Sequence, residues 1–141
     1  MWFSSVFGSI FSTGKPTSPV RTYSEGLVAY KSGQYTEAVA GLRPYAEKGD
    51  ALAQLTLGNM YKNGLGVPKD LEQAAHWYRK SAMQGDADAK FSLAMMYMRG
   101  GGVTGDKTQA LDWLKDAAAQ GHRQARLAYD YITREEYQNV R

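Results

Sequence analysis

The chain has 141 residues, which is enough for one domain with a continuous core and too few for two globular domains. Its 17 lysine and arginine residues and 14 aspartate and glutamate residues give a formal charge of +3, without the large clustered basic excess typical of nucleic-acid-binding proteins, so no nucleic-acid partner is predicted. The absence of cysteine excludes disulfides and thiolate metal sites, and no apolar run reaches the roughly 18 residues that span a bilayer.

Residues 1–12 are predicted to form an amphipathic leader helix. On a helical wheel, bulky apolar side chains occupy one half of this segment, and serines and a glycine occupy the other. The apolar half consists of Trp2, Phe3, Val6, Phe7, Ile10 and Phe11. This face suits contact with the first hairpin, self-association with a neighbouring copy, or binding to a membrane surface or a protein groove. A targeting role is a further alternative, although a basic n-region is missing.

Residues 13–21 are predicted to be a linker, because small polar residues and prolines dominate there. Residues 22–50 are predicted to form a degenerate helical hairpin. Tyr30, Gly33 and Ala38 match positions of the later units if the loop between the helices is shorter by about five residues.

A 36-residue pattern then occurs twice in succession, as residues 51–86 and 87–122. Many positions are identical after a shift by 36 residues, for example Trp77 and Trp113. A period in the thirties is typical of proteins in which one supersecondary unit repeats in space and buries its apolar face against its neighbours. The sequence therefore predicts a repeat protein.

Each unit is predicted to be a hairpin of two helices, called helix A and helix B. Apolar residues at three- and four-residue spacings predict helix A over residues 51–63 and 87–99. Glycines follow helix A and are expected to adopt positive φ angles in the turn. Asp70 and Asp106 are then predicted to cap helix B.

Residues 123–141 are predicted to form a C-terminal capping helix. Its beginning continues the helix A pattern, but Thr133 replaces the repeated tyrosine and no glycine loop follows. A terminal repeat needs a polar outer face. The residues expected to supply it are Arg134, Glu135, Glu136 and Gln138.

The unit from Ala51 to Asp86 reads ALAQLTLGNMYKNGLGVPKDLEQAAHWYRKSAMQGD. This sequence closely resembles the Sel1-like repeat, a relative of the tetratricopeptide repeat. The resemblance implies an all-α fold, a right-handed α-solenoid of helical hairpins whose A helices line the concave surface. It also implies a role as an adaptor or scaffold in protein complexes. Some secreted members carry a disulfide in each repeat, which a chain without cysteine cannot form.

Motifs for catalysis or metal binding are not supported. Residues 100–108 match a phosphate-binding loop only superficially, because Asp106 separates the glycine from the lysine. Residues 12–15 match the S-x-x-K motif of penicillin-recognising enzymes, but the partner motifs are absent. His76 and His122 have no metal-ligand partners at suitable spacing and are expected to be solvated. No catalytic residue, cofactor site or metal site is therefore predicted.

Positions that differ between the two units are the candidates for partner binding. In helix A these differences lie away from the repeated apolar stripe. The candidates are Asn59, Lys62 and Asn63 in the first unit and Met95, Met98 and Arg99 in the second. Met95 and Met98 are expected to be exposed and to suit adaptable recognition, the alternative being contacts with the capping helix.

The repeated aromatic residues are expected to be structural. Their recurrence at the repeat period indicates a core position rather than a ligand cage. They are Trp77, Trp113, Tyr61 and Tyr97.

The predicted function is that of a non-catalytic adaptor that binds a protein or peptide on the concave face of the solenoid. One alternative is a membrane-associated regulatory adaptor anchored by residues 1–12. Another is a weak hydrolase, because some Sel1-like proteins have been described as lactamases. A cytoplasmic or membrane-peripheral location is favoured, and a periplasmic one stays open.

Overall fold

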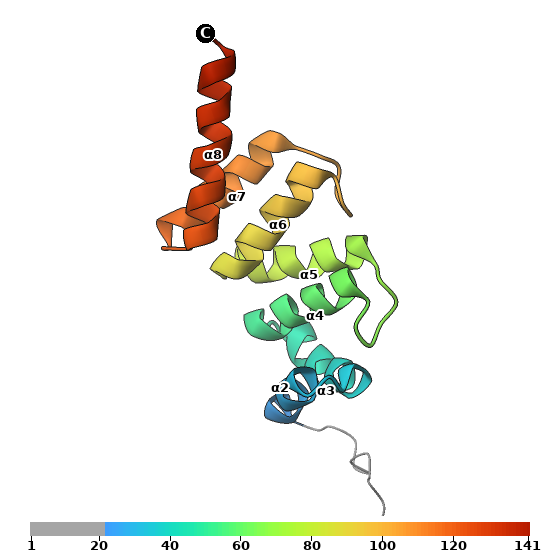
Figure 1. The fold of residues 1–141 in the computed structure, drawn as a ribbon. Coiled ribbons are helices and arrows are strands. Elements are labelled where there is room, and N and C mark those ends of the chain that lie inside the picture. Colours follow the sequence, from blue (N-terminus) through green and yellow to red (C-terminus); the bar gives the residue numbers. More distant parts are fainter. Residues whose placement is uncertain (1–21) are drawn as a thin grey trace, which may run out of the picture.

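The computed structural model describes residues 22–141, which form seven α-helices and no strand (Figure 1). The predicted leader helix, its apolar face and the linker lie outside the described residues. The helices are α2 (Tyr23–Lys31), α3 (Tyr35–Glu47), α4 (Ala51–Asn63), α5 (Leu71–Met83), α6 (Ala87–Arg99), α7 (Lys107–Ala119) and α8 (Arg123–Asn139).

The helices form an α-solenoid, as the sequence predicted. Each helix packs mainly against the helices that precede and follow it, so the stack advances in chain order from α2 to α8 (Figure 1). Three pairs of helices make hairpins, and α8 follows as a single helix at the C-terminal end. None of the helices described in residues 22–141 combines the length and the apolar character that crossing a membrane requires.

Four of the helices have an aspartate as the N-cap residue, and these aspartates recur at the 36-residue spacing of the repeat. Each carboxylate accepts the backbone N–H three residues ahead, at distances of 2.7 to 3.0 Å, and so satisfies a donor that has no partner within the helix. These aspartates are Asp50, Asp70, Asp86 and Asp106. The hydrogen bond from the Gln109 backbone lowers the pKa of Asp106.

The loops between helices A and B need glycine for two reasons. Gly66 and Gly102 have φ angles of 69° and 74°, as the sequence predicted. A Cβ at Gly102 would also lie 2.1 Å from the carbonyl oxygen of Leu71, and one at Gly66 would lie 2.4 Å from the backbone of Tyr35. Each loop therefore rests on the first turn of the preceding helix B, which joins neighbouring hairpins.

The repeated aromatic residues are buried to different degrees. Trp77 and Tyr97 are core residues with 5% and 7% of their surface exposed, whereas Tyr61 and Trp113 are only half-buried. The expectation of core positions is therefore confirmed for Trp77 and Tyr97, and it holds in part for Tyr61 and Trp113, which pack against the core clusters but are partly exposed. Tyr61 keeps its hydroxyl at the surface, where it accepts a 2.8 Å hydrogen bond from Arg43.

The neighbours of the two tryptophans explain their unequal burial. In α5, the ammonium group of Lys80 lies 5.1 Å from the centroid of the Trp77 ring, and the His76 ring packs edge-on against it at 5.3 Å. The shift by 36 residues places the shorter side chains Asp112 and Asp116 at these positions in α7. Trp113 consequently has less cover than Trp77.

The outer face of α8 is polar only in part. The four residues that were expected to make this face polar are exposed, namely Arg134, Glu135, Glu136 and Gln138. Leu127, Tyr131 and Tyr137 are exposed on the same helix, so the capping helix also presents apolar surface.

Candidate partner-binding pocket

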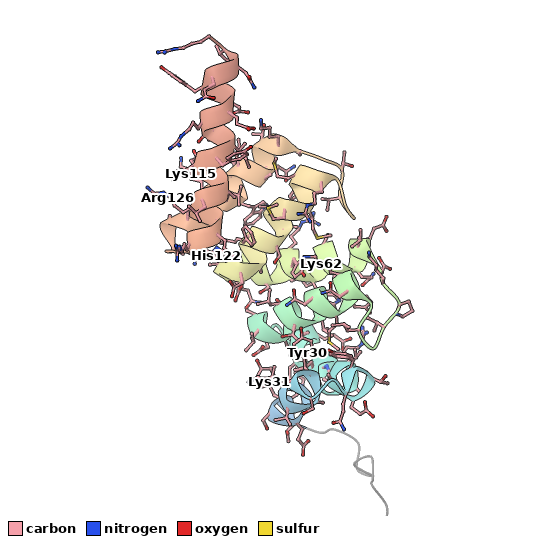
Figure 2. All side chains as sticks on the ribbon, viewed as in Figure 1. Tyr30, Lys31, Lys62, Lys115, His122 and Arg126 are labelled. Atoms are coloured by element: carbon pink, nitrogen blue, oxygen red, sulfur yellow. The ribbon has the colours of Figure 1, made fainter. Side chains whose placement is uncertain are left out.

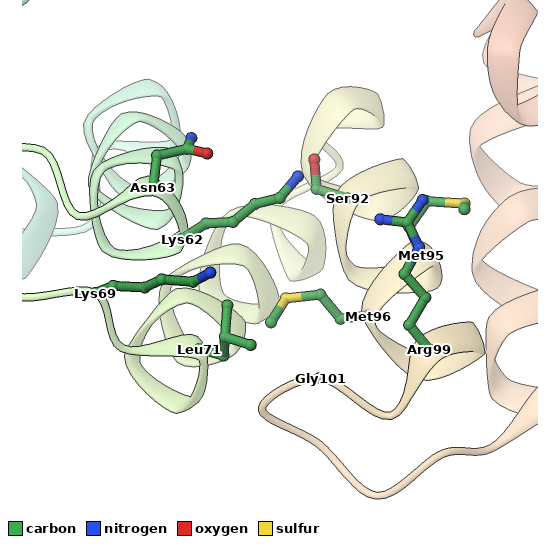
Figure 3. Close-up of a pocket in the computed structure, with 9 residues that line it drawn as sticks. All are labelled: Lys62, Asn63, Lys69, Leu71, Ser92, Met95, Met96, Arg99 and Gly101. Carbon is green, nitrogen blue, oxygen red and sulfur yellow. The ribbon is translucent and has the colours of Figure 1, made fainter.

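A pocket of about 290 Å³ opens between α4 and α6, above the start of α5 (Figure 3). The last turn of α4 and the α4–α5 loop form one side of it, and α6 forms the other. Its lining residues are Lys62, Asn63, Lys69, Leu71, Ser92, Met95, Met96, Arg99 and Gly101. We call this site the α4–α6 pocket.

The α4–α6 pocket contains four of the six candidate binding residues, namely Lys62, Asn63, Met95 and Arg99. The other lining residues were not among the sequence candidates. Lys69 and Leu71 could have been found by the same criterion, because a shift by 36 residues places Gly105 and Lys107 at these positions. Met96 gave no such signal, since Met60 occupies its position in the first unit.

The floor of the α4–α6 pocket is apolar. Leu71 and Met96 point toward each other from α5 and α6, and Met96 is 6% exposed (Figure 3). Met95 of α6 is half-buried and also lines the pocket. Unbranched thioether side chains adapt to ligands of different shape, so this floor suits an apolar side chain of a partner.

The expectation that both variable methionines are exposed is wrong. Met98 is half-buried and packs against the core cluster that includes Leu93 and Tyr97. Positions outside the repeated stripe are not all exposed to solvent, because neighbouring helices cover two sides of helix A.

The rim of the α4–α6 pocket is cationic. Lys62, Lys69 and Arg99 are exposed, and no lining residue carries a carboxylate. The four ion pairs found within residues 22–141 involve other side chains. Figure 3 shows Lys62 and Lys69 extending from the α4 side toward α6. The pocket therefore combines an apolar floor with positive charge on both sides.

Asn59 has a structural role instead of facing a partner freely. Its side-chain oxygen accepts a 2.6 Å hydrogen bond from the Tyr78 hydroxyl. Burial raises the pKa of Tyr78 above its ordinary value, so this hydroxyl stays protonated and needs an acceptor. In the second unit Leu114 replaces the tyrosine, and Met95 replaces the asparagine. This difference between the units therefore reflects a matched pair of residues.

His122 is not solvated as expected, since its side chain is only 12% exposed. Its Nδ1 accepts the backbone N–H of Ala125 at 3.1 Å, so His122 caps α8 where aspartates cap the earlier A helices. The neutral ring then carries its proton on Nε2, which donates to Asp88 at 3.0 Å. The ring also stacks on Phe91 of α6. Figure 2 shows His122 near the start of α6.

No cluster of three or more histidine, aspartate or glutamate side chains with the geometry of a metal site occurs within residues 22–141. His76 is exposed on α5. The lining of the α4–α6 pocket contains no histidine and no carboxylate, so the groups that it offers to a ligand are ammonium, guanidinium, amide, hydroxyl and thioether groups.

Two relatives are similar in sequence to part of the chain. An exopolysaccharide production negative regulator of Rhizobium leguminosarum bv. viciae is 41% identical over 68 residues, which is 48% of this chain and 26% of that protein. A protein of the same description from Rhizobium meliloti is 44% identical over 59 residues, covering 41% of this chain and 22% of the relative. The chain thus matches about a quarter of the length of these relatives.

Solved structures resemble the whole solenoid. A Sel1 repeat protein from Oxalobacter formigenes superposes with a TM-score of 0.76 and 36% identity, over 79% of this chain and 46% of that structure. The protective antigen c5321 of uropathogenic Escherichia coli superposes with a TM-score of 0.67 and 33% identity, over 86% of this chain and 26% of that structure. The cysteine-rich protein B of Helicobacter pylori superposes with a TM-score of 0.61 and 26% identity, over 73% of this chain and 79% of that structure.

The family model of the Sel1 repeat matches residues 51–86 and 87–122, together just over half of the chain. Proteins with this repeat generally mediate protein–protein interactions, and the family is typically non-enzymatic. Both tandem units fit the family pattern, and the solved Sel1 repeat structure superposes on most of the solenoid. The chain therefore belongs to the Sel1 repeat family.

Proposed function

We propose that the chain is a non-catalytic adaptor that binds a segment of a partner protein in the α4–α6 pocket. The observation that carries the proposal is the convergence of Lys62, Asn63, Met95 and Arg99 on one pocket. These residues come from two different repeats and were selected because they differ between the repeats. A position that serves only the fold is expected to stay the same in both units, as Leu57 and Leu93 do, or to change together with the residue that it contacts, as position 59 does with position 78.

The pocket has the character of a site for a side chain or short segment. Its floor is formed by half-buried and buried apolar residues, and its rim is polar. Protein interfaces combine such a desolvated apolar centre with a solvated polar rim. The pocket also lies between helices of neighbouring hairpins, where a solenoid presents extended binding surfaces.

The hydrolase alternative receives less support. It requires a serine, a lysine and an acid that converge on one face. Ser92 and Lys62 both line the α4–α6 pocket, but the lining includes no acid.

A membrane-associated regulatory adaptor is a second candidate, favoured by the amphipathic pattern of residues 1–12. The two Rhizobium relatives are described as negative regulators of exopolysaccharide production, and a regulatory role fits an adaptor. Flotation of the full chain and of a chain lacking residues 1–12 with liposomes distinguishes the two candidates. Equal flotation of both forms would show that residues 1–12 do not anchor the chain to the membrane.

A photo-crosslinking residue at position 95 tests the adaptor function. Met83 supplies the matched control, because it is an exposed methionine on α5 that does not line the pocket. In cells of the source organism, we expect position 95 to give a discrete crosslinked protein that position 83 does not give. Identical crosslinking patterns at the two positions would contradict binding in the α4–α6 pocket.

A further inference from the structure

We infer that the occupant of the α4–α6 pocket is an acidic peptide segment in which one apolar side chain is flanked by carboxylates. This inference rests on the proposed function and adds the chemistry of the partner. The apolar side chain contacts Leu71, Met95 and Met96, and the flanking carboxylates pair with the cations of the rim.

The positions of the three cations suit a segment that crosses the pocket. Lys62 and Lys69 belong to the α4 side, and Arg99 belongs to α6 on the other side (Figure 3). Carboxylates on both sides of a central apolar residue would therefore each meet a positive charge. Arg99 can bind a carboxylate through two parallel hydrogen bonds, which adds orientation as well as energy.

The corresponding space between α6 and α8 supports the inference by contrast. There Lys107, at the position of Leu71, forms an ion pair of 2.6 Å with Glu136 of α8. The position of Arg99 is occupied by Glu135. Lys107 thus has a carboxylate partner from the chain itself, whereas the described residues supply none to the cations of the α4–α6 pocket.

Two other occupants fit the charges less well. The leader, residues 1–12, contains no aspartate or glutamate, so it would leave the cations unpaired. A nucleic acid would need a longer basic track than three cations, and the formal net charge of the chain is only +3. Both are included as competing ligands in the test.

The test uses the full chain and fluorescein-labelled peptides of twelve residues with a central leucine or phenylalanine. The flanking residues are Asp and Glu in one set, Asn and Gln in a second and Lys in a third. We expect anisotropy to show binding of the acidic set at least about tenfold tighter than the neutral set, a difference that falls as salt is raised. Arg99→Glu and Lys69→Glu should each weaken acidic binding, and Arg99→Glu should improve binding of the lysine set.

Lys115→Glu is the matched control, since it makes the same charge change at an exposed lysine outside the α4–α6 pocket. It should leave acidic binding within about twofold of the parent, because exposed charges separated by more than a Debye length of roughly 8 to 10 Å are screened. Melting curves by circular dichroism verify that all three variants are folded. Equal weakening by Lys115→Glu and Arg99→Glu would overturn the inference.

Peptides carrying a photo-crosslinker separate the two proposals. If neutral peptides, or a peptide of residues 1–12, crosslink beside Met95 with the same efficiency as acidic peptides, the acidic preference is overturned. The proposed adaptor function would not be affected by that result. A single-stranded oligonucleotide that displaces the acidic peptide and loses affinity on Arg99→Glu would also overturn it. Crosslinking of none of the peptides beside Met95 would count against both proposals.

Discussion

The α4–α6 space and the α6–α8 space occupy equivalent positions of the repeat and have different chemistry. Each lies between successive A helices, above the start of a B helix. In the first, Lys69, Leu71 and Arg99 line an open pocket with an apolar floor. In the second, the ion pair between Lys107 and Glu136 joins α7 to α8. Successive spaces of one solenoid can therefore carry different chemistry at equivalent positions of the repeat.

The hairpins that border these spaces differ in a matched way as well. In the first unit, Gly58 makes room for the Tyr78 ring, since a Cβ there would lie 2.6 Å from it. In the second unit, Ala94 and Leu114 occupy the corresponding positions. A larger residue on helix A accompanies a smaller one on helix B, so each core stays filled.

The largest expected effect concerns the two tryptophans. Trp77→Ala should lower the free energy of unfolding by about 3 to 5 kcal/mol, because it leaves a cavity in a closed core. Trp113→Ala should cost about half as much, since the half-buried ring loses less buried surface. Urea unfolding followed by circular dichroism measures both. Equal losses would contradict the unequal cover of the two rings.

The second prediction tests the matched packing of the hairpins. Gly58→Ala should destabilise the chain by about 1 to 3 kcal/mol, because the new methyl group overlaps the buried Tyr78 ring. Ala94→Gly, the converse change in the second unit, should cost about 1 kcal/mol of helix propensity and about 0.8 kcal/mol for the loss of a buried methyl group. Replacing Tyr78 by Leu in the Gly58→Ala chain should recover part of the loss. A Gly58→Ala variant with a raised melting temperature would refute the packing argument.

The third prediction separates structure from recognition at Asn59. Asn59→Met should cost about 1 to 2 kcal/mol, because the Tyr78 hydroxyl loses its acceptor. In a Tyr78→Phe background the same substitution should cost clearly less. The coupling in this double-mutant cycle measures the hydrogen bond. Additive effects of the two substitutions would show that Asn59 does not act through Tyr78.

The fourth prediction concerns the ion pair between Lys107 of α7 and Glu136 of α8. Glu136→Gln should lower the free energy of unfolding by less than about 1 kcal/mol, because Lys107 and Glu136 are both about half exposed. The difference between variant and parent should shrink as salt is raised. A loss well above this value, independent of salt, would show that the pair holds α8 in place.

The smallest effect concerns the cap of α7. Hydrogen bonds in the folded state lower the pKa of Asp106 from its ordinary value of 3.8. The stability that this carboxylate contributes is therefore present above that value and is lost as the pH falls through the folded-state pKa. As the pH is lowered from 5 to 3, the melting temperature of the parent should fall relative to that of Asp106→Asn. A constant difference over this range would contradict the shift.

Much of the fold follows from the sequence by itself. The repeat spacing, the helix A spacings and the cap positions predicted helical hairpins with the observed bounds of α4 and α6 and the observed starts of α5 and α7. The resemblance to the Sel1-like repeat implied the α-solenoid. The turn glycines were predicted correctly as well. Helix spacing, helix caps and the φ angles of turn glycines depend on residues within about four positions of the chain, so a single unit contains the information for them.

Only the tertiary structure decided which variable side chains meet. Lys69 and Arg99 lie 30 positions apart, and they face the same pocket because two hairpins pack side by side. The burial of Met98 and the bond between His122 and Asp88 also depend on neighbouring helices. Periodicity identifies the face of a helix, but the exposure of that face depends on what the next hairpin covers, because solenoid units bury their surfaces against one another.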